Sequence, residues 1–143
     1  FIHKGTLASD LVFLIPNASL YHFGILETNV HMAWMRAVCG RLEMRYRYSK
    51  DVVYNNFPWP SPTPEQQAKI EAAAQAILDA RALYPDSSLA DLYDPILMPK
   101  ELLLAHREND RAVMQAYGFS TKMVESECVA TLIKLHADWV KRQ

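Results

Sequence analysis

The spacing of hydrophobic residues changes twice within the first 60 positions of the chain. Leu11–Ile15 is an unbroken apolar run followed by turn residues, which is typical of a short buried strand. Between Leu20 and Cys39 the apolar residues recur at intervals of three and four, which predicts helix. Gly24 and Asn29 mark where this helix would be interrupted or capped again.

An alternation of period two follows the helical pattern. Apolar and polar residues take turns through Leu42-Glu43-Met44-Arg45-Tyr46-Arg47-Tyr48-Ser49. Such an alternation predicts a strand that carries its apolar residues on one side and its polar residues on the other. A second short strand is predicted from Asp51 to Tyr54.

Four prolines within eight residues interrupt the chain at Phe57–Pro64. This segment can form neither a helix nor a central strand, because proline lacks the backbone N–H that both require. It is therefore predicted to be a stiff, extended connector. The chain then divides into residues 1–57, a connector over 58–64 and a helical part over 65–143.

Helix start and stop signals dominate the sequence after the connector. Thr63-Pro64-Glu65-Gln66 is a capping box with proline at the first helical position, and the helix that it begins should end before Pro85. Ser88 is placed to cap a short turn, Pro99 to begin a third helix that ends at Gly118, and Ser120 to cap the last helix. We expect the last two helices to form an antiparallel hairpin, and the fold class to be α+β, predominantly α-helical.

The composition is that of a compact folded chain, and one segment of the chain differs from the rest in its positive charge. Half of the 143 residues are hydrophobic and 22% are charged, so a packed core is expected. The net charge is −1, yet residues 36–50 hold five basic residues against one acidic residue. A local basic cluster points to an anionic partner for that segment, although such clusters are also common on ordinary solvated surface.

Several classes of protein and site find no support in the sequence. The longest uncharged stretch, Leu11–Leu26, falls short of the ~20 apolar residues of a membrane span, so no membrane partner is expected. Cys39 and Cys128 are far apart and predict two buried thiols in a reducing cytoplasm. Because the sequence opens on Phe1 rather than methionine, we expect it to be a piece of a longer protein.

No catalytic, cofactor or metal site is predicted within the chain. His106 and Asp110 lie one helical turn apart, but such a pair is more often a surface hydrogen bond than part of a metal site. Asn56-Phe57-Pro58-Trp59 is close to the Asn/Asp-Pro-Pro-aromatic loop of amino-methylating DNA methyltransferases, in which a flipped base is held. Phe57 replaces the first proline and no glycine-rich cofactor motif precedes it, so we reject a catalytic role. Phe57 and Trp59 are instead expected to pack the connector onto both halves of the chain.

The polar side of the predicted strand has the chemistry to read a G·C base pair. Glu43 and Arg45, as alternate residues, would lie about 7 Å apart on one side. Glutamate can accept a hydrogen bond from cytosine N4, and arginine can donate two to guanine. The surrounding polar and basic residues would hold phosphates; they are Arg36, Arg41, Arg47, Ser49 and Lys50. An ordinary exposed strand of mixed charge is an equal alternative at this point.

Three blocks of the sequence resemble the C-terminal part of the MmeI-like (type IIL/IIG) restriction-modification proteins. They are Phe23–Leu26 with His31–Arg41, then Tyr46–Pro60, then Leu89–Pro95 with Met98-Pro99, Ala105-His106 and Asp110–Val113. The resemblance covers roughly residues 20 to 118, and the middle block is the most specific. It implies that residues 1–57 end a target-recognition domain and that residues 65–143 form a helical C-terminal domain.

The resemblance also implies a parent protein and its partners. Proteins of this family join a nuclease, an adenine-N6 methyltransferase domain that uses S-adenosylmethionine, a target-recognition domain and a helical segment. We therefore expect a bacterial, cytoplasmic parent in which this chain contacts double-stranded DNA and the upstream methyltransferase domain, with no cofactor of its own. By position, the family nominates Glu43 and Arg45 as base readers. A helical protein-interaction or scaffold module without DNA readout is the alternative.

Overall fold

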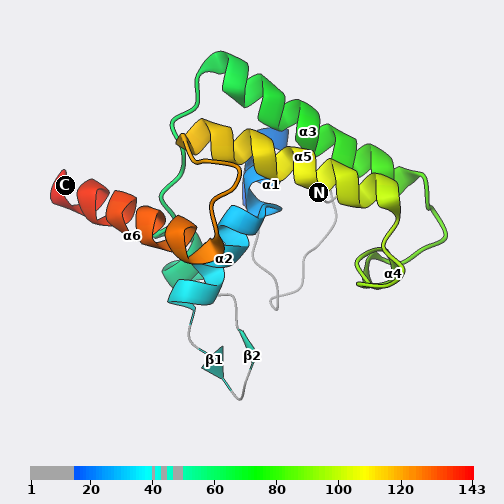
Figure 1. The fold of residues 1–143 in the computed structure, drawn as a ribbon, viewed down its shortest axis with the longest axis horizontal. Coiled ribbons are helices and arrows are strands. Elements are labelled where there is room, and N and C mark those ends of the chain that lie inside the picture. The colour runs from blue at the N-terminus through cyan, green and yellow to red at the C-terminus, as the bar shows by residue number, and fades with distance from the viewer. Residues whose placement is uncertain (1–14, 40, 43–44, 47–49) are drawn as a thin grey trace.

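The computed structural model describes residues 15–39, 41–42, 45–46 and 50–143, and this part of the chain is predominantly helical (Figure 1). The elements are α1 (Leu20–Leu26), α2 (Asn29–Val38), β1 (Arg41–Leu42), β2 (Arg45–Tyr46), η1 (Lys50–Tyr54), α3 (Pro64–Ala82), α4 (Leu89–Leu92), α5 (Lys100–Tyr117) and α6 (Glu125–Lys141). The predicted predominance of helix is thus confirmed. Strand in the described residues is limited to one short antiparallel pair, β1 and β2.

Two long helices, α3 and α5, lie side by side and antiparallel, and α1 packs against both (Figure 1). Their buried faces carry small and aliphatic residues at helical spacing, such as Ile70, Ala74 and Ile77 of α3 and Leu102 and Val113 of α5. This spacing places one apolar stripe on each helix, and the two stripes face each other. The α3–α5 pair forms the helical frame of the fold, and the other elements are arranged around it.

The proline-rich connector is part of the hydrophobic core. The Phe57 side chain is only 4% exposed, and its ring makes edge-to-face contacts with His31 and Trp34 of α2 at centroid distances of 4.5 and 6.1 Å. Trp59 lies beside Tyr21 of α1, and the Tyr117 hydroxyl of α5 donates to the Pro58 carbonyl at 2.7 Å. The expectation that Phe57 and Trp59 pack the connector onto both halves of the chain is therefore confirmed.

Most predicted helix ends after the connector are confirmed. Thr63 and Gln66 form the reciprocal capping box of α3, with Pro64 as its first residue, and α3 ends before Pro85. Ser88 caps α4 by accepting from the Asp91 N–H at 3.2 Å. Gly118 ends α5 with φ at 76°, a left-handed conformation that a residue with a Cβ rarely adopts.

The predicted strands are the part of the fold that needs correction. Asp51–Tyr54, predicted as a strand, lies in the π-helix η1. Two of its carbonyls accept from side chains: Trp34 Nε1 donates to the Val53 carbonyl at 3.0 Å, and Asn56 Nδ2 donates to the Asp51 carbonyl at 2.8 Å. The strand predicted at 11–15 falls almost wholly outside the described residues, and Ile15 itself has no regular structure.

The last helix also differs from expectation. The Ser120 hydroxyl accepts from the Lys122 N–H at 3.3 Å within a turn, and α6 begins only at Glu125, so the predicted cap at Ser120 is wrong. The predicted α5–α6 hairpin is wrong as well, since α6 packs mainly on α2 and points away from the α3–α5 pair (Figure 1). The buried residues Cys128 and Leu132 of α6 join the core around Trp34.

Both cysteines are buried, as predicted, and no disulfide joins them. Among the described residues, no helix combines the length and the apolar character that a bilayer crossing requires.

Candidate nucleic-acid interface

The candidate DNA-reading segment is a short two-stranded ribbon rather than one strand. Arg41 of β1 pairs with Tyr46 of β2, and Leu42 pairs with Arg45, in antiparallel register. One continuous strand from Leu42 to Ser49 is therefore wrong, because an alternation of period two is common to one strand and to two paired strands. Figure 1 shows the ribbon extending from the end of α2, away from the α3–α5 pair. A two-stranded ribbon is one of the two shapes that the DNA major groove admits.

The predicted site residues fall into three groups. Arg41, Arg45 and Lys50 are placed by their backbone in β1, β2 and the first residue of η1. Glu43, Arg47 and Ser49 lie outside the described residues, as does Gly40. Because Arg45 belongs to the second strand, the 7 Å spacing of Glu43 and Arg45 along a single strand no longer supports the pair. Their nomination as base readers stays a prediction that rests on residue chemistry and on the resemblance.

Arg36, predicted to bind phosphate, is engaged by a carboxylate in the structure. Its Nε lies 2.7 Å from Glu125 Oε1, and both side chains are partly exposed, at 35% and 54%. An ion pair at this exposure adds little stability, with a typical value of roughly 0–1 kcal/mol. Its evident consequence is geometric, since it joins the last turn of α2 to the first turn of α6.

The helix that leads into the ribbon is fixed by its buried face. The Thr28 hydroxyl caps α2 by accepting from the His31 N–H at 3.2 Å, and it donates to the Ile25 carbonyl at 2.6 Å. Trp34 is 2% exposed and donates its indole N–H to η1, so the segments before and after the ribbon are tied together. Burial lowers the pKa of His31 from 6.5 to about 4, which keeps this imidazole neutral at ordinary pH.

Two neighbouring residues of α5 hold the junction between α1 and α2. Asn109 is fully buried and donates through Nδ2 to the Gly24 carbonyl at 2.7 Å, which the short helix α1 leaves unpaired at its end. Asp110 accepts twice from Asn29, the first residue of α2: from the backbone N–H at 2.9 Å and from Nδ2 at 2.7 Å. Burial raises the pKa of Asp110, and these two hydrogen bonds oppose that rise. One turn of α5 thus satisfies the end of α1 and the beginning of α2.

A second polar cluster joins the end of α1 to the far end of the helical frame. Arg81 of α3 lies 3.3 Å from Glu27 Oε2 and donates twice to the Tyr93 hydroxyl, at 3.0 and 2.6 Å. The same hydroxyl bonds His106 Nε2. Burial, and then the charge of Arg81, lower the pKa of His106.

His106 and Asp110, considered above as part of a metal site, therefore take part in two separate sets of hydrogen bonds. Within the part of the chain that the structure describes, no three His, Cys, Asp or Glu side chains come together as metal ligands.

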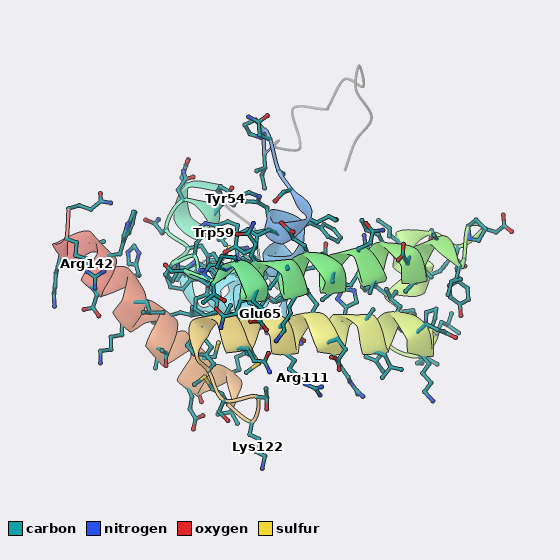
Figure 2. All side chains as sticks on the ribbon, turned by 90° about the horizontal axis from the view of Figure 1, so that it is seen from above. Tyr54, Trp59, Glu65, Arg111, Lys122 and Arg142 are labelled. Atoms are coloured by element: carbon teal, nitrogen blue, oxygen red, sulfur yellow. The ribbon has the colours of Figure 1, made fainter. Side chains whose placement is uncertain are left out.

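Two hollows flank the helices near the connector and the ribbon. One of about 540 Å³ lies between α2, α5 and the beginning of α6, and its rim includes Arg36, Arg107 and Arg111. Figure 2 shows Arg111 and Lys122 on the side of α5 that faces away from α3. The other, of about 650 Å³, lies between the connector and α6 and is lined by Trp59, Tyr117 and Trp139. Figure 2 shows Tyr54 and Trp59 close to each other, and their ring centroids are 5.8 Å apart.

Sequence reasoning missed the residues that orient α2. Thr28 carries a local signal, because a threonine one residue before a helical run is a typical N-cap. Asn109 and Asp110 carry none, since their partners lie 85 and 81 residues away. Glu125 is equally remote from Arg36.

Both halves of the chain match models of known protein families. The family model described as the MmeI target recognition domain matches residues 1–61, and the model described as the MmeI C-terminal domain matches residues 62–142. DNA methyltransferase A of Bacillus subtilis (strain 168) is 39% identical over 137 residues, which is 96% of this chain and 16% of that protein. The structure of the type IIL restriction-modification enzyme MmeI in complex with DNA is similar at a TM-score of 0.84 and 49% identity, over 89% of this chain and 17% of that one. The chain thus spans about one sixth of the length of these relatives.

Proposed function

The chain belongs to the MmeI family, of which it contains target-recognition and C-terminal domain sequence, and from this premise we propose that it is the DNA-recognition end of a restriction-modification methyltransferase. In this proposal the ribbon β1–β2 reads base pairs of double-stranded DNA, and the helices after the connector hold it in place. Both similar proteins support the assignment: one is named a DNA methyltransferase, and the other is a restriction-modification enzyme solved with DNA.

The observation that carries the proposal is the position and charge of the ribbon. It extends from the helical body, and Arg41 and Arg45 belong to its two strands (Figure 1). Arginine is the commonest reader of guanine in the major groove, and glutamate can accept from cytosine. We propose Glu43 and Arg45 as the base readers, and Arg36, Arg41, Arg47, Ser49 and Lys50 as phosphate contacts.

The parent protein in this proposal methylates adenine at N6 within a specific site. It works in the cytoplasm, and its upstream methyltransferase domain supplies the S-adenosylmethionine site. This chain contributes no catalytic residue. Its part is to select which duplex segment reaches the reaction, so substitutions here should change where methylation occurs before they change how fast it occurs.

Methylation by the intact protein over a library of randomised duplexes tests the proposal. Arg45→Ala and Glu43→Ala should each relax the preference at one base pair, by about 1–3 kcal/mol per lost contact. Lys50→Ala should instead weaken binding to all sequences and lower the slope of log K against log salt by about one. Lys100→Ala, at the first residue of α5, is the control that removes a positive charge away from the ribbon. Unchanged preferences in both ribbon variants would contradict base reading by this segment.

A second candidate function rests on the hollow between α6 and the connector. Leu135 and Trp139 of α6 are 38% and 47% exposed, and both line this 650 Å³ hollow. Apolar surface gathered in this way often marks a docking site. The occupant that we propose is the methyltransferase domain of the same polypeptide. In that case Trp139→Ser in the intact protein should lower methylation equally at all sites and open a new protease-sensitive point, with sequence preference unchanged.

A further inference from the structure

The described part of the ribbon consists of two strands of two residues each, so its direction depends on α2, the helix that leads into it. On the structure, α2 is held at both ends by the domain that follows the connector. Asn29, at its first position, is bound by Asp110 of α5, and Arg36, in its last turn, is bound by Glu125 of α6. Neither contact involves a neighbour in sequence.

The contact at Asn29 is built to fix orientation. Asp110 Oδ1 accepts from the backbone N–H, and Oδ2 accepts from the side-chain amide, so two parallel bonds set both the position and the rotation of the first turn. The adjacent Asn109 fixes the end of α1 through the Gly24 carbonyl. A two-bond contact to a carboxylate is more directional than a single one. The angle between α1 and α2 is therefore defined by one turn of α5.

The contact at Arg36 adds the second fixed point. The guanidinium lies on the face of α2 that turns toward α6, beside the 540 Å³ hollow. These two contacts, one near each end of a ten-residue helix, add to the packing of its buried face and restrict both its tilt and its rotation about its axis. Any tilt of α2 would displace the ribbon, which follows after Cys39.

From this arrangement we propose that Asp110 and Glu125 are positioning residues for DNA recognition, which act through α2 on the ribbon without touching DNA. The proposal rests on the proposed function of the ribbon and assigns the C-terminal domain a share in sequence specificity. Base readout needs hydrogen-bond geometry that small displacements break, so loosening α2 weakens discrimination between sites.

The test exploits the reciprocal chemistry of Asn29 and Asp110 in the intact protein. Asn29→Asp sets one carboxylate against another, whereas Asp110→Asn can keep both bonds, because the Asn29 amide can turn by 180° and accept through Oδ1 from the new N–H₂. The double variant Asn29→Asp/Asp110→Asn restores a donor opposite an acceptor at the same atoms, and the backbone N–H of residue 29 keeps an acceptor. Asp86→Asn, on an exposed turn, is the matched control for the loss of one carboxylate.

Methylation of a randomised duplex library measures preference at every position of the recognised site. Asn29→Asp should lower discrimination at one or more base pairs by about tenfold, and the double variant should regain it. A purely structural role predicts another result: activity falls with the fraction of folded protein, while the pattern of preference keeps its wild-type form. Thermal unfolding of each variant, measured in parallel, gives that fraction.

Glu125→Ala keeps the proposal testable if the Asn29 and Asp110 variants fold poorly, because the Arg36–Glu125 pair is partly exposed and contributes little to stability. It should also lower discrimination. Wild-type preference in Glu125→Ala, or a loss in Asn29→Asp that the double variant does not reverse, would overturn the proposal while site-specific methylation by the wild-type protein stands. A wild-type protein without any site preference would overturn the proposed function as well.

Discussion

Gly24→Ala should destabilise the protein, although alanine is the better helix former. Gly24 lies within α1 where this helix crosses α3 and α5, and a Cβ there would lie 2.9 Å from Ile70 Cγ2. It would also lie 3.2 Å from Ala74 Cβ and 3.2 Å from Asn109 Oδ1. Ile70 is fully buried and β-branched, so its methyl group has no free rotamer into which it can retreat.

Three contributions decide the size of the effect. Replacing glycine by alanine inside a helix contributes about 1 kcal/mol of stability. Crowding a close-packed core costs about 1–3 kcal/mol. If α1 moves away to relieve the contact, the bond from Asn109 to the Gly24 carbonyl is lost, which costs about 1 kcal/mol more. The balance is a loss of about 1–3 kcal/mol in the free energy of unfolding.

Urea unfolding followed by tryptophan fluorescence measures this loss, because Trp34 and Trp59 lie in and beside the core that α1 helps to close. Ala76→Gly on the exposed side of α3 is the control, since it changes helix propensity by a similar amount without any change in packing. A Gly24→Ala protein as stable as the wild type, or more stable, would refute the close approach of the three helices at this point.

Three further effects follow from the same structure. In Gly118→Ala the new Cβ meets no atom within 4 Å, but residue 118 must still adopt φ of 76°. Urea unfolding should therefore show a loss of about 1 kcal/mol in the free energy of unfolding from backbone conformation alone, and no loss would contradict the left-handed cap. The pKa of His31 is about 4 in the folded protein and 6.5 in the unfolded chain. Between these two values the unfolded chain binds more protons than the folded protein, so the free energy of unfolding should fall as pH is lowered from about 6.5 toward 4. The slope of unfolding free energy against pH in that window should be smaller in His31→Gln, and an equal slope would contradict the buried neutral imidazole. Tyr93→Phe removes the hydroxyl shared by Arg81 and His106 and should cost about 1–3 kcal/mol in urea unfolding, whereas a neutral result would mean that this cluster adds nothing to stability.

The features that could be predicted from sequence are those with local causes. The beginning of α3 follows from a capping box of four consecutive residues, and the end of α5 from one glycine. The extended connector follows from its prolines, and the burial of Phe57 follows from a large aromatic residue held in a stiff segment. The Thr28 cap was within reach of the same rules.

The features that could not be predicted depend on contacts between distant segments. The direction of α6 is set by the packing of Cys128 and Leu132 against α2, and an apolar stripe does not specify which helix covers it. An alternating pattern does not distinguish one strand from a pair, so the register of β1 and β2 had to come from the structure. The prediction of Asp51–Tyr54 as a strand was wrong because this segment lies in the π-helix η1, whose Val53 and Asp51 carbonyls accept from the side chains of Trp34 and Asn56.

The burial of Phe57 limits how recognition modules of this family can be recombined. A crossover placed in the proline segment would combine His31, Trp34 and Phe57 of one parent with the core faces of α3, α5 and α6 of another. Such chimeras would inherit mismatched interiors although each half is intact in sequence. A graft confined to the residues between Cys39 and Lys50 would keep His31, Trp34 and Phe57 together with the core faces of α3, α5 and α6 from the same parent, and it would transplant the ribbon. The segment that is free to diversify is thus far shorter than the domain that contains it.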